Sequence, residues 1–336
     1  MNKKTPFILK RIFAISFLML IFLMGAMFFG ILMGSTGSGL KEAVHSLLGA
    51  RDTNPMLHAI IWQIRFPRVL LAILVGAALS LGGLVFQALL RNPLAEPYIL
   101  GISSGSGIGA IIGILAGLSR FPGVSLAAFA GSMATLLLLL VMSSEQTILK
   151  RDSLLLSGVM VNAFCAALIM FLISITQDSR LHNILFWLMG DLSMADMGQV
   201  IILGVTILPC FILLFFFSNS MNLLLTGKEM AQTTGVNIKA VTATLLIATT
   251  LMVSATVSHC GPIGFVGLVI PHLLRLILGS DHRLLVPACI LGGGTYMVLC
   301  DLLARTLPGQ GEMPAGVVTA MIGAPLFIIL LKRKGR

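Results

Sequence analysis

The sequence predicts an all-α integral membrane protein with about ten transmembrane helices. Of its 336 residues, 57% are hydrophobic and only 10% are charged, and the mean hydropathy is +1.03. A soluble domain of this length could not cover its surface with so few charged residues. Apolar stretches of about 17–25 residues, long enough to cross a bilayer as helices, recur along the chain. We therefore expect residues 1–336 to form a single transmembrane domain.

Ten apolar stretches follow one another along the chain. We expect them to span the membrane in this order: Ile12–Met33, Val69–Leu90, Ile99–Leu118, Val124–Met142, Leu154–Ile175, Gln199–Phe217, Ala240–Ser258, Pro262–Gly279, Leu284–Ala304 and Ala315–Leu331. The first is too long for the hydrophobic part of a secretion signal, so we interpret it as a membrane anchor. The eighth is the least regular, because Pro271, His272 and Arg275 interrupt it.

The basic residues predict the orientation. Placing the N-terminus in the cytoplasm gives ten crossings and a cytoplasmic C-terminus, and it puts fifteen of the 22 lysines and arginines inside. The net charge of +10 is then a topology signal, and no basic face suggests nucleic acid. The basic residues left outside are Lys41, Arg51, Arg65, Arg68, Arg120, Arg180 and Arg305.

The third stretch carries a glycine at every fourth position: Gly101, Gly105, Gly109, Gly113 and Gly117. Small residues at this spacing let two helix backbones approach closely in lipid. The alternative is a phosphate-binding loop, but no strand precedes this run and no Lys-Ser/Thr pair follows it. The five cysteines are scattered singly and show no metal-binding spacing, so we interpret them as packing residues.

A short polar segment, Leu223–Ala240, separates the sixth and seventh stretches and is cytoplasmic on the predicted topology. Thr226 and Glu229 have the spacing of a capping box at a helix start. Gly235 suits the left-handed end of a helix, and Asn237 offers a cap for the next one. The segment is either a docking element for a soluble partner or an interfacial loop helix. Its polar faces favour docking.

Energy-coupling machinery is missing from the sequence. Of the 12 acidic residues only Asp301 lies inside an apolar stretch, four residues before Arg305. Ion-coupled carriers usually place carboxylates or broken helices at mid-membrane. Gly227-Lys228 is followed by Glu229, so there is no P-loop, and no Ser/His/Asp, paired-carboxylate or HExxH pattern indicates an enzyme. A transporter of this kind would take its work from a partner.

Three runs carry a resemblance to a known family: RFPRVLLAILVGAALSLGGLVFQALLRNPLAEPYILGISSGSG (Arg65–Gly107), GPIGFVGLVIPHLLR (Gly261–Arg275) and PAGVVTAMIGAPLFIILLKR (Pro314–Arg333). In order and spacing they resemble the permeases of type II ABC importers for ferric siderophores, haem and vitamin B12. The match covers nearly the whole chain.

The resemblance implies the type II ABC importer permease fold and a multi-pass location in the bacterial inner membrane. It implies a homodimer of ten-helix subunits with two ABC ATPase subunits beneath it, which would hold ATP and Mg²⁺. A periplasmic or lipid-anchored binding protein would dock on top. It also implies two related halves of opposite orientation, stretches two to five and seven to ten.

The resemblance assigns the coupling and docking residues. Coupling helices that enter a groove on the ATPase match about residues 223–239: Thr226, Gly227, Lys228, Glu229, Met230, Ala231, Gln232 and Gly235. Arginines that pair with glutamates of the binding protein match Arg65, Arg68 and Arg305. The alternatives for these arginines are snorkelling to lipid headgroups or a local pair, such as Arg305 with Asp301.

The resemblance also assigns a cytoplasmic gate at the dimer axis to the turn after the second stretch, with Asn92, Pro93 and Leu94 as candidates. Two prolines would make this turn stiff and extended; the alternative is an ordinary turn. A second gate element would precede the fifth stretch. There the chain offers Arg151, Asp152 and Ser153 instead of the small hydroxyl residues of relatives, which puts that assignment in doubt.

The transport pathway implied by the resemblance runs between the fifth and tenth stretches of two copies. Ser157, Asn162, Thr176 and Gln177 are candidates to line it, and they could equally be buried groups that hydrogen-bond between helices. His259 and His272 invite a haem-ligand interpretation. We favour a structural role for both, because a single histidine in a packed helix is more often structural.

The sequence thus predicts a permease that passes a large iron chelate or vitamin B12 by alternating access, with no catalytic residue, metal or cofactor of its own. Ferric siderophore, haem and cobalamin are not distinguished. One alternative is an ion-coupled secondary transporter, which would work without an ATPase. Another is a membrane scaffold without transport activity, against which the gate-like turn argues.

Overall fold

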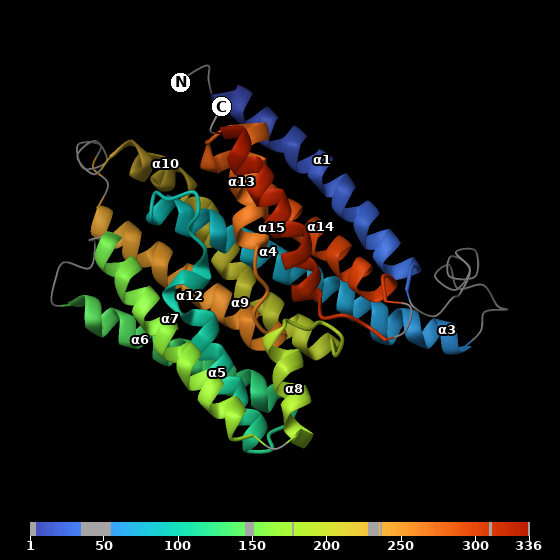
Figure 1. Ribbon diagram of the computed structural model, residues 1–336. Helices are drawn as coiled ribbons and strands as arrows, with labels where there is room; N and C mark the ends of the chain where they lie inside the picture. Colours follow the sequence, from blue (N-terminus) through green and yellow to red (C-terminus); the bar gives the residue numbers. More distant parts are fainter. Residues whose placement is uncertain are drawn as a thin grey trace.

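The structure is a computed structural model that describes residues 5–34, 55–144, 151–176, 178–227, 235, 237–308 and 311–334. This part of the chain is built from helices and contains no strand (Figure 1). The helices are α1 (Thr5–Leu32), α3 (Pro55–Ala59), α4 (Phe66–Leu89), α5 (Ile102–Leu115), α6 (Ser125–Ser144), α7 (Arg151–Ser174), α8 (Asp178–Leu188), α9 (Met197–Phe216), α10 (Ser218–Thr226), α12 (Ile238–Cys260), α13 (Val266–Leu278), α14 (His282–Thr306) and α15 (Ala315–Lys334).

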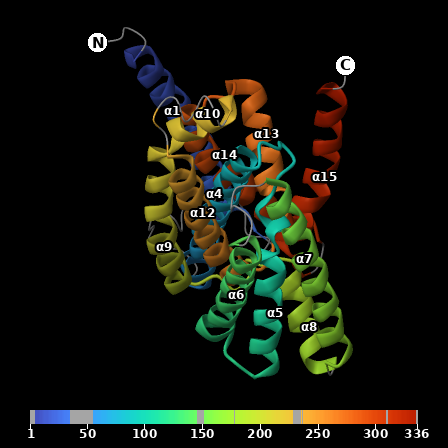
Figure 2. The same cartoon turned by 90° about the vertical axis from the view of Figure 1, so that its left-hand side faces the viewer.

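The expected membrane architecture is confirmed. Among the described residues, seven helical stretches are long and apolar enough to cross a membrane, and three shorter apolar helices, α5, α13 and α15, join them. These follow the order of the ten predicted stretches. Both chain ends lie at the same end of the molecule, beside α10 and α13, while α8 lies at the opposite end (Figures 1 and 2).

The second span begins earlier than predicted. Instead of starting at Val69, it runs as one helical stretch over Pro55–Leu89, in which a π-helical turn at Ile60–Arg65 joins α3 to α4. Pro67 has no N–H to donate, and the wider turn just before it accommodates the missing hydrogen bond. Arg65 and Arg68, expected just outside the span, therefore lie inside it.

The third and eighth spans are shorter than predicted and share a plan. The third begins at Ile102 rather than Ile99, after the turn Pro97–Leu100, and the eighth begins at Val266 rather than Pro262. Each short helix, of 14 residues in α5 and 13 in α13, follows a long helix and a connecting segment, which before α5 includes the 3-10 turn Pro97–Leu100. The runs α4–α7 and α12–α15 have this same order of elements, as expected for two related halves.

Two helices of the structure were not predicted. One is α8, an 11-residue helix between the fifth and sixth spans. The other is α10, which is separated from α9 by the single residue Phe217 and carries the chain to Thr226. Neither is long enough to cross the membrane.

Glycines allow close contacts between helix backbones in the core of the molecule. A Cβ added at Gly76 on α4 would overlap the carbonyl oxygen of Gly293 on α14, and one at Gly293 would overlap that of Gly76. On α5, a Cβ at Gly109 would overlap the carbonyl oxygen of Ala127 on α6. The predicted packing role of the glycine repeat is thus confirmed at Gly109.

Candidate functional site

A cluster of buried ions joins α4 to α14 at the end of the molecule opposite the termini. The Arg68 guanidinium donates through Nε to Asp301 at 2.8 Å and through Nη1 to Glu312 at 2.5 Å. Arg305 pairs with the other Asp301 oxygen at 3.1 Å, which confirms the local pair considered from the sequence. We name Arg65, Arg68, Asp301, Arg305 and Glu312 the arginine cluster.

The same cluster holds the end of α1. Arg65 donates to the carbonyl oxygens of Leu32 at 2.8 Å and Ile31 at 3.1 Å, and Arg305 donates to that of Gly30 at 3.0 Å. The last carbonyls of a helix have no partner within it. Here two guanidinium groups supply the donors, so α1 is fixed against α4 and α14 without exposing backbone polar groups.

The position of the three arginines departs from the expected exposed rim. Arg65, Arg68 and Arg305 are only 3%, 2% and 3% exposed, and each has partners inside the chain. They border a pocket of about 190 Å³, together with Glu312, Gly34, Ile60 and Ile64. Glu312 is the more exposed member, with 35% of its side chain accessible. The sequence did not single it out, although it is an acidic residue in the segment between two spans.

The predicted gate turn is compact, and the residues that follow it are bonded to the segment before α13. The side-chain oxygen of Asn92 accepts the N–H of Leu94 at 2.9 Å, which is the hydrogen bond of an Asx turn, and Leu94 is 44% exposed. Pro93 lies between them. Beyond the turn, Tyr98 donates through its hydroxyl to the carbonyl oxygen of Ile263 at 2.9 Å and accepts the Ile263 N–H at 3.0 Å.

Glu96 completes this anchor. Its carboxylate accepts the N–H of Phe265 at 3.1 Å, and Phe265 is the residue that precedes α13, with φ of 68°. A carboxylate here satisfies one of the free N–H groups at the start of a helix. Burial raises the pKa of Glu96 to about 7, and the hydrogen bond from Phe265 opposes that rise. The segments that precede α5 and α13 in the two halves are thereby joined.

The predicted pathway residues lie on or just after α7. Ser157 is half-buried and Asn162 is exposed, with its side-chain oxygen accepting a hydrogen bond from Ser104 of α5. Thr176 donates to the carbonyl oxygen of Leu172 at 2.6 Å, and Gln177 lies outside the described residues. Much of α7 is exposed, with large apolar side chains such as Phe164 at 67%.

The predicted coupling segment is described only at its margins. Thr226 is the last residue of α10, Gly227 follows with φ of 125°, and Gly235 has the expected left-handed φ of 81°. The remaining predicted coupling residues, Lys228, Glu229, Met230, Ala231 and Gln232, lie outside the described residues. Asn237 caps α12 as predicted, since its side chain accepts the Ala240 N–H at 3.1 Å.

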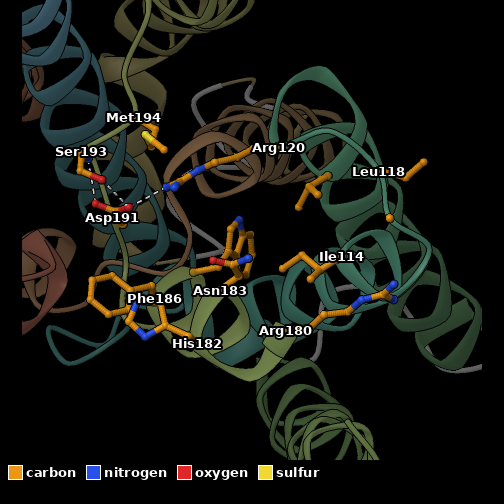
Figure 3. A pocket seen from close by; sticks show the side chains of 13 residues that line it. Ile114, Leu118, Arg120, Arg180, His182, Asn183, Phe186, Asp191, Ser193 and Met194 are labelled. Carbon is orange, nitrogen blue, oxygen red and sulfur yellow. Dashed lines mark hydrogen bonds and ion pairs between the residues drawn. The ribbon is translucent and has the colours of Figure 1, made fainter. Parts of the chain in front are cut away.

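A second, larger pocket of about 540 Å³ lies between α5 and α8 at the end opposite the termini. Figure 3 shows Arg120 reaching across it to Asp191, at 2.6 Å, and Asn183 and His182 on its α8 side. Burial alone would raise the pKa of Asp191, but hydrogen bonds from Arg120 and Ser193 lower it below its usual value. Arg180 also lines the pocket, so its two arginines exceed its single carboxylate by one charge.

The two histidines make packing contacts. His259 bonds through Nδ1 with the carbonyl oxygen of Ala255 at 2.8 Å, and its ring lies 5.7 Å from that of Phe121. His272 is buried against Phe327 with ring centroids 5.7 Å apart. Within the described ranges, His, Cys, Asp and Glu form no group of three that could hold a metal ion.

A sequence model of the FecCD transport family matches residues 19–333. The chain belongs to the FecCD transport family. The resemblance found in the sequence is thereby confirmed, and the chain is the permease of an ABC importer rather than an unrelated membrane protein.

Two relatives show how similar other permeases are to this FecCD chain. The vitamin B12 import system permease protein BtuC of Salmonella typhi is 41% identical over 278 residues, which cover 82% of this chain and 84% of the relative. The uncharacterized ABC transporter permease protein YvrB of Bacillus subtilis is 41% identical over 298 residues, covering 86% and 82%.

Solved structures agree with the type II fold. A metal-chelate type ABC transporter in an inward-facing conformation has a TM-score of 0.85 and 32% identity, covering 95% of this chain and 99% of that chain. PsaBC from Streptococcus pneumoniae in complex with a Fab has a TM-score of 0.58 at 19% identity, covering 85% and 94%, and shares the fold alone.

Proposed function

We propose that this FecCD permease is the membrane subunit of an ATP-driven importer of vitamin B12 in the bacterial inner membrane. The observation that carries the proposal is the 41% identity with the vitamin B12 import permease BtuC over 82% of the chain. The chain would act as a homodimer, pass the corrinoid by alternating access, and leave ATP hydrolysis to two separate ABC ATPase subunits.

The exposed face of α7 supports the homodimer. Asn162 is exposed in the middle of a span, and its amide oxygen is bonded to Ser104. Contact with lipid would offer no acceptor for the NH2 group of the same amide. A face that combines this amide with large apolar side chains suits a second copy and a polar pathway between the two. Ser157 and Thr176 would extend that pathway toward either end of α7.

The arginine cluster supports docking of a binding protein through acidic side chains. Arg65, Arg68 and Arg305 outnumber the cluster's two carboxylates, and Glu312, the more exposed carboxylate, already sits on Arg68. An incoming glutamate would take the place of Glu312 in the pocket. Such charge complementarity fixes the orientation of partners and speeds their encounter.

The inner side of the molecule supports coupling to ATPases. The segment Thr226–Gly235 follows α10 on the predicted cytoplasmic side, and the turn Asn92–Leu94 lies at the inner end of α4. Nucleotide-driven closure of the ATPases would move the permease halves as rigid bodies and open or close this turn at the dimer axis.

A ferric or other metal chelate is the second candidate substrate. The match to a metal-chelate type transporter at 32% identity favours it. So does the outer pocket, whose Arg120 and Arg180 exceed the single carboxylate of Asp191 and suit an anionic ligand more than a neutral corrinoid.

The test is uptake by the reconstituted complex of permease, ATPase and binding protein. The binding protein is offered with cobalamin, haem or ferric siderophore in turn, and uptake into proteoliposomes is measured. We expect ATP-dependent uptake of cobalamin. Uptake of the ferric siderophore instead, with a loss in Arg180→Ala, would establish the second candidate and contradict the first.

A further inference from the structure

The inner end of α14 is tied to α10 through one side chain. Asn222 of α10 donates through Nδ2 to the Asp281 carboxylate at 2.8 Å, and its oxygen accepts the N–H of His282 at 2.8 Å. Both halves of the amide are therefore used, and both partners lie at the first residues of α14. We name these three residues the α10–α14 joint.

The α10–α14 joint is held in place by buried neighbours. His282 is fully buried, and Met221 and Leu224, the neighbours of Asn222 on α10, are buried in the core. Asp281 caps α14 by accepting the N–H of Arg283 at 3.0 Å. Burial alone would raise the pKa of Asp281, but hydrogen bonds from Arg283 and Asn222 lower it to about 2, so the carboxylate stays charged.

From the joint, α14 runs as one helix to the arginine cluster, with Pro287 in its second turn. Its 25 residues span about 37 Å at 1.5 Å per residue. Asp281 and His282 stand at one end, and Asp301 and Arg305 stand in the last turns at the other. One continuous helix thus connects α10 with the pocket where a binding protein is proposed to dock.

The helix α4 is packed tightly against α14. Their backbones touch at Gly76 and Gly293, where no side chain separates them, and Arg68 joins Asp301 at the outer end. Tightly packed contacts of this kind have low compressibility and transmit strain. The inner end of α4 leads into the gate turn at Asn92, so the pair also reaches the proposed gate.

On the other side of the joint, α10 stops at Gly227. The backbone there has φ of 125° and ψ of 155°, a combination that essentially only glycine adopts. The chain therefore changes direction where the proposed coupling segment begins, while α10 itself stays docked on the core.

We propose that Asn222 is a positioning residue that transmits movement between the coupling segment and α14, and through the α4–α14 pair between the ATPases and the arginine cluster. This inference rests on the proposed function, in which an ATPase holds residues 226–235. When a binding protein docks on the outer side, the response of the ATPases would pass through the hydrogen-bonded α10–α14 joint on the inner side.

The experiment measures ATP hydrolysis by the complex of permease, ATPase and binding protein in nanodiscs. The binding protein carries cobalamin, haem or ferric siderophore, whichever stimulates the wild type most. In Asn222→Ala we expect basal hydrolysis and ATPase retention to be kept, and stimulation by the loaded binding protein to fall at least about 5-fold. The matched control is Asn219→Ala, an exposed asparagine on the same helix, which should behave as the wild type.

A double variant separates transmission from loss of structure. Asn222→Asp combined with Asp281→Asn exchanges the two side chains, keeps an acceptor for the His282 N–H and a cap for α14, and should restore stimulation. Wild-type stimulation in Asn222→Ala, or equal loss of basal and stimulated hydrolysis, would overturn the inference. A wild-type complex that neither binds an ATPase nor responds to any binding protein would instead refute the proposed function.

Discussion

Protonation of Glu96 should make the stability of the folded protein depend on pH. Burial raises its pKa from 4.5 to about 7, so between these values the folded protein keeps a proton that the unfolded chain has released. The unfolded chain therefore gains relative stability as pH rises, and the free energy of unfolding decreases across this window. Below pH 4.5 both states are protonated, and above pH 7 the decrease is complete.

We expect the thermal midpoint of the purified permease to fall between pH 5 and pH 8 because of this group. Glu96→Gln keeps an acceptor for the Phe265 N–H but does not titrate, so its midpoint should change less over the same range. The measurement is thermal unfolding in detergent at several pH values. Parallel curves for the two proteins would show that Glu96 does not titrate in this window.

A test of docking at the arginine cluster needs a substitution that does not destabilise the fold. Reversing Arg68 to glutamate would break its buried pair with Asp301 and place a second carboxylate there, with Arg305 as the remaining partner of Asp301. Breaking a buried pair typically costs about 3–5 kcal/mol. A loss of docking in such a variant could then result from unfolding alone. Glu312 is better placed, because it touches Arg68 from the exposed side.

We predict that Glu312→Gln lowers the Kd for the binding protein several-fold, because it removes the carboxylate that competes for Arg68. Biolayer interferometry on the permease in nanodiscs measures the Kd, and Glu312→Asp, which keeps the charge, is the control. The gain should shrink in high salt, since docking would depend on charge. Unchanged or weaker binding in Glu312→Gln would argue against docking at this pocket.

At the scale of the helices, the contact between α4 and α14 contributes to the free energy of unfolding. In Gly293→Ala the new methyl group would overlap the backbone of Gly76, and the two helices would have to separate. We expect a loss of about 1–3 kcal/mol in unfolding free energy, typical of overpacking, and a lower thermal midpoint. The control is Gly25→Ala on α1, where no atom lies within 4 Å. Equal midpoints for the two variants would contradict this.

The sequence predicted those elements whose signal is local. Long apolar runs predicted the order of the spans, and Asn237 predicted the start of α12. The late start of α13 was not predictable in this way, because it depends on Glu96 capping a helix from 169 positions away. The short helices α8 and α10 carry too few apolar residues to stand out.

The candidate site was predicted only in part, for a related reason. The resemblance named Arg65, Arg68 and Arg305 but placed them on an exposed rim. Their burial depends on Asp301 and Glu312, which lie more than 230 positions from Arg68 in the chain, and on the end of α1. The joint at Asn222 has the same origin, since a side chain on α10 meets α14 only after the bundle has formed.

At the scale of the whole molecule, the described residues place the arginine cluster and the end of α10, where the proposed coupling segment begins, at opposite ends of one bundle. Two runs of helices with the same order of elements meet where the segments before α5 and α13 join. Such an arrangement suits a permease whose halves rock about a common centre. The only acidic residue found within a predicted stretch, Asp301, is engaged by two arginines, so it offers no site for a coupling ion.

The most direct measurement is substrate uptake into proteoliposomes that contain the permease with and without its ATPase. We expect accumulation of cobalamin only when the ATPase, ATP and the loaded binding protein are all present, and no effect of an imposed proton or sodium gradient. Accumulation by the permease alone, driven by such a gradient, would contradict this account and identify an ion-coupled secondary transporter.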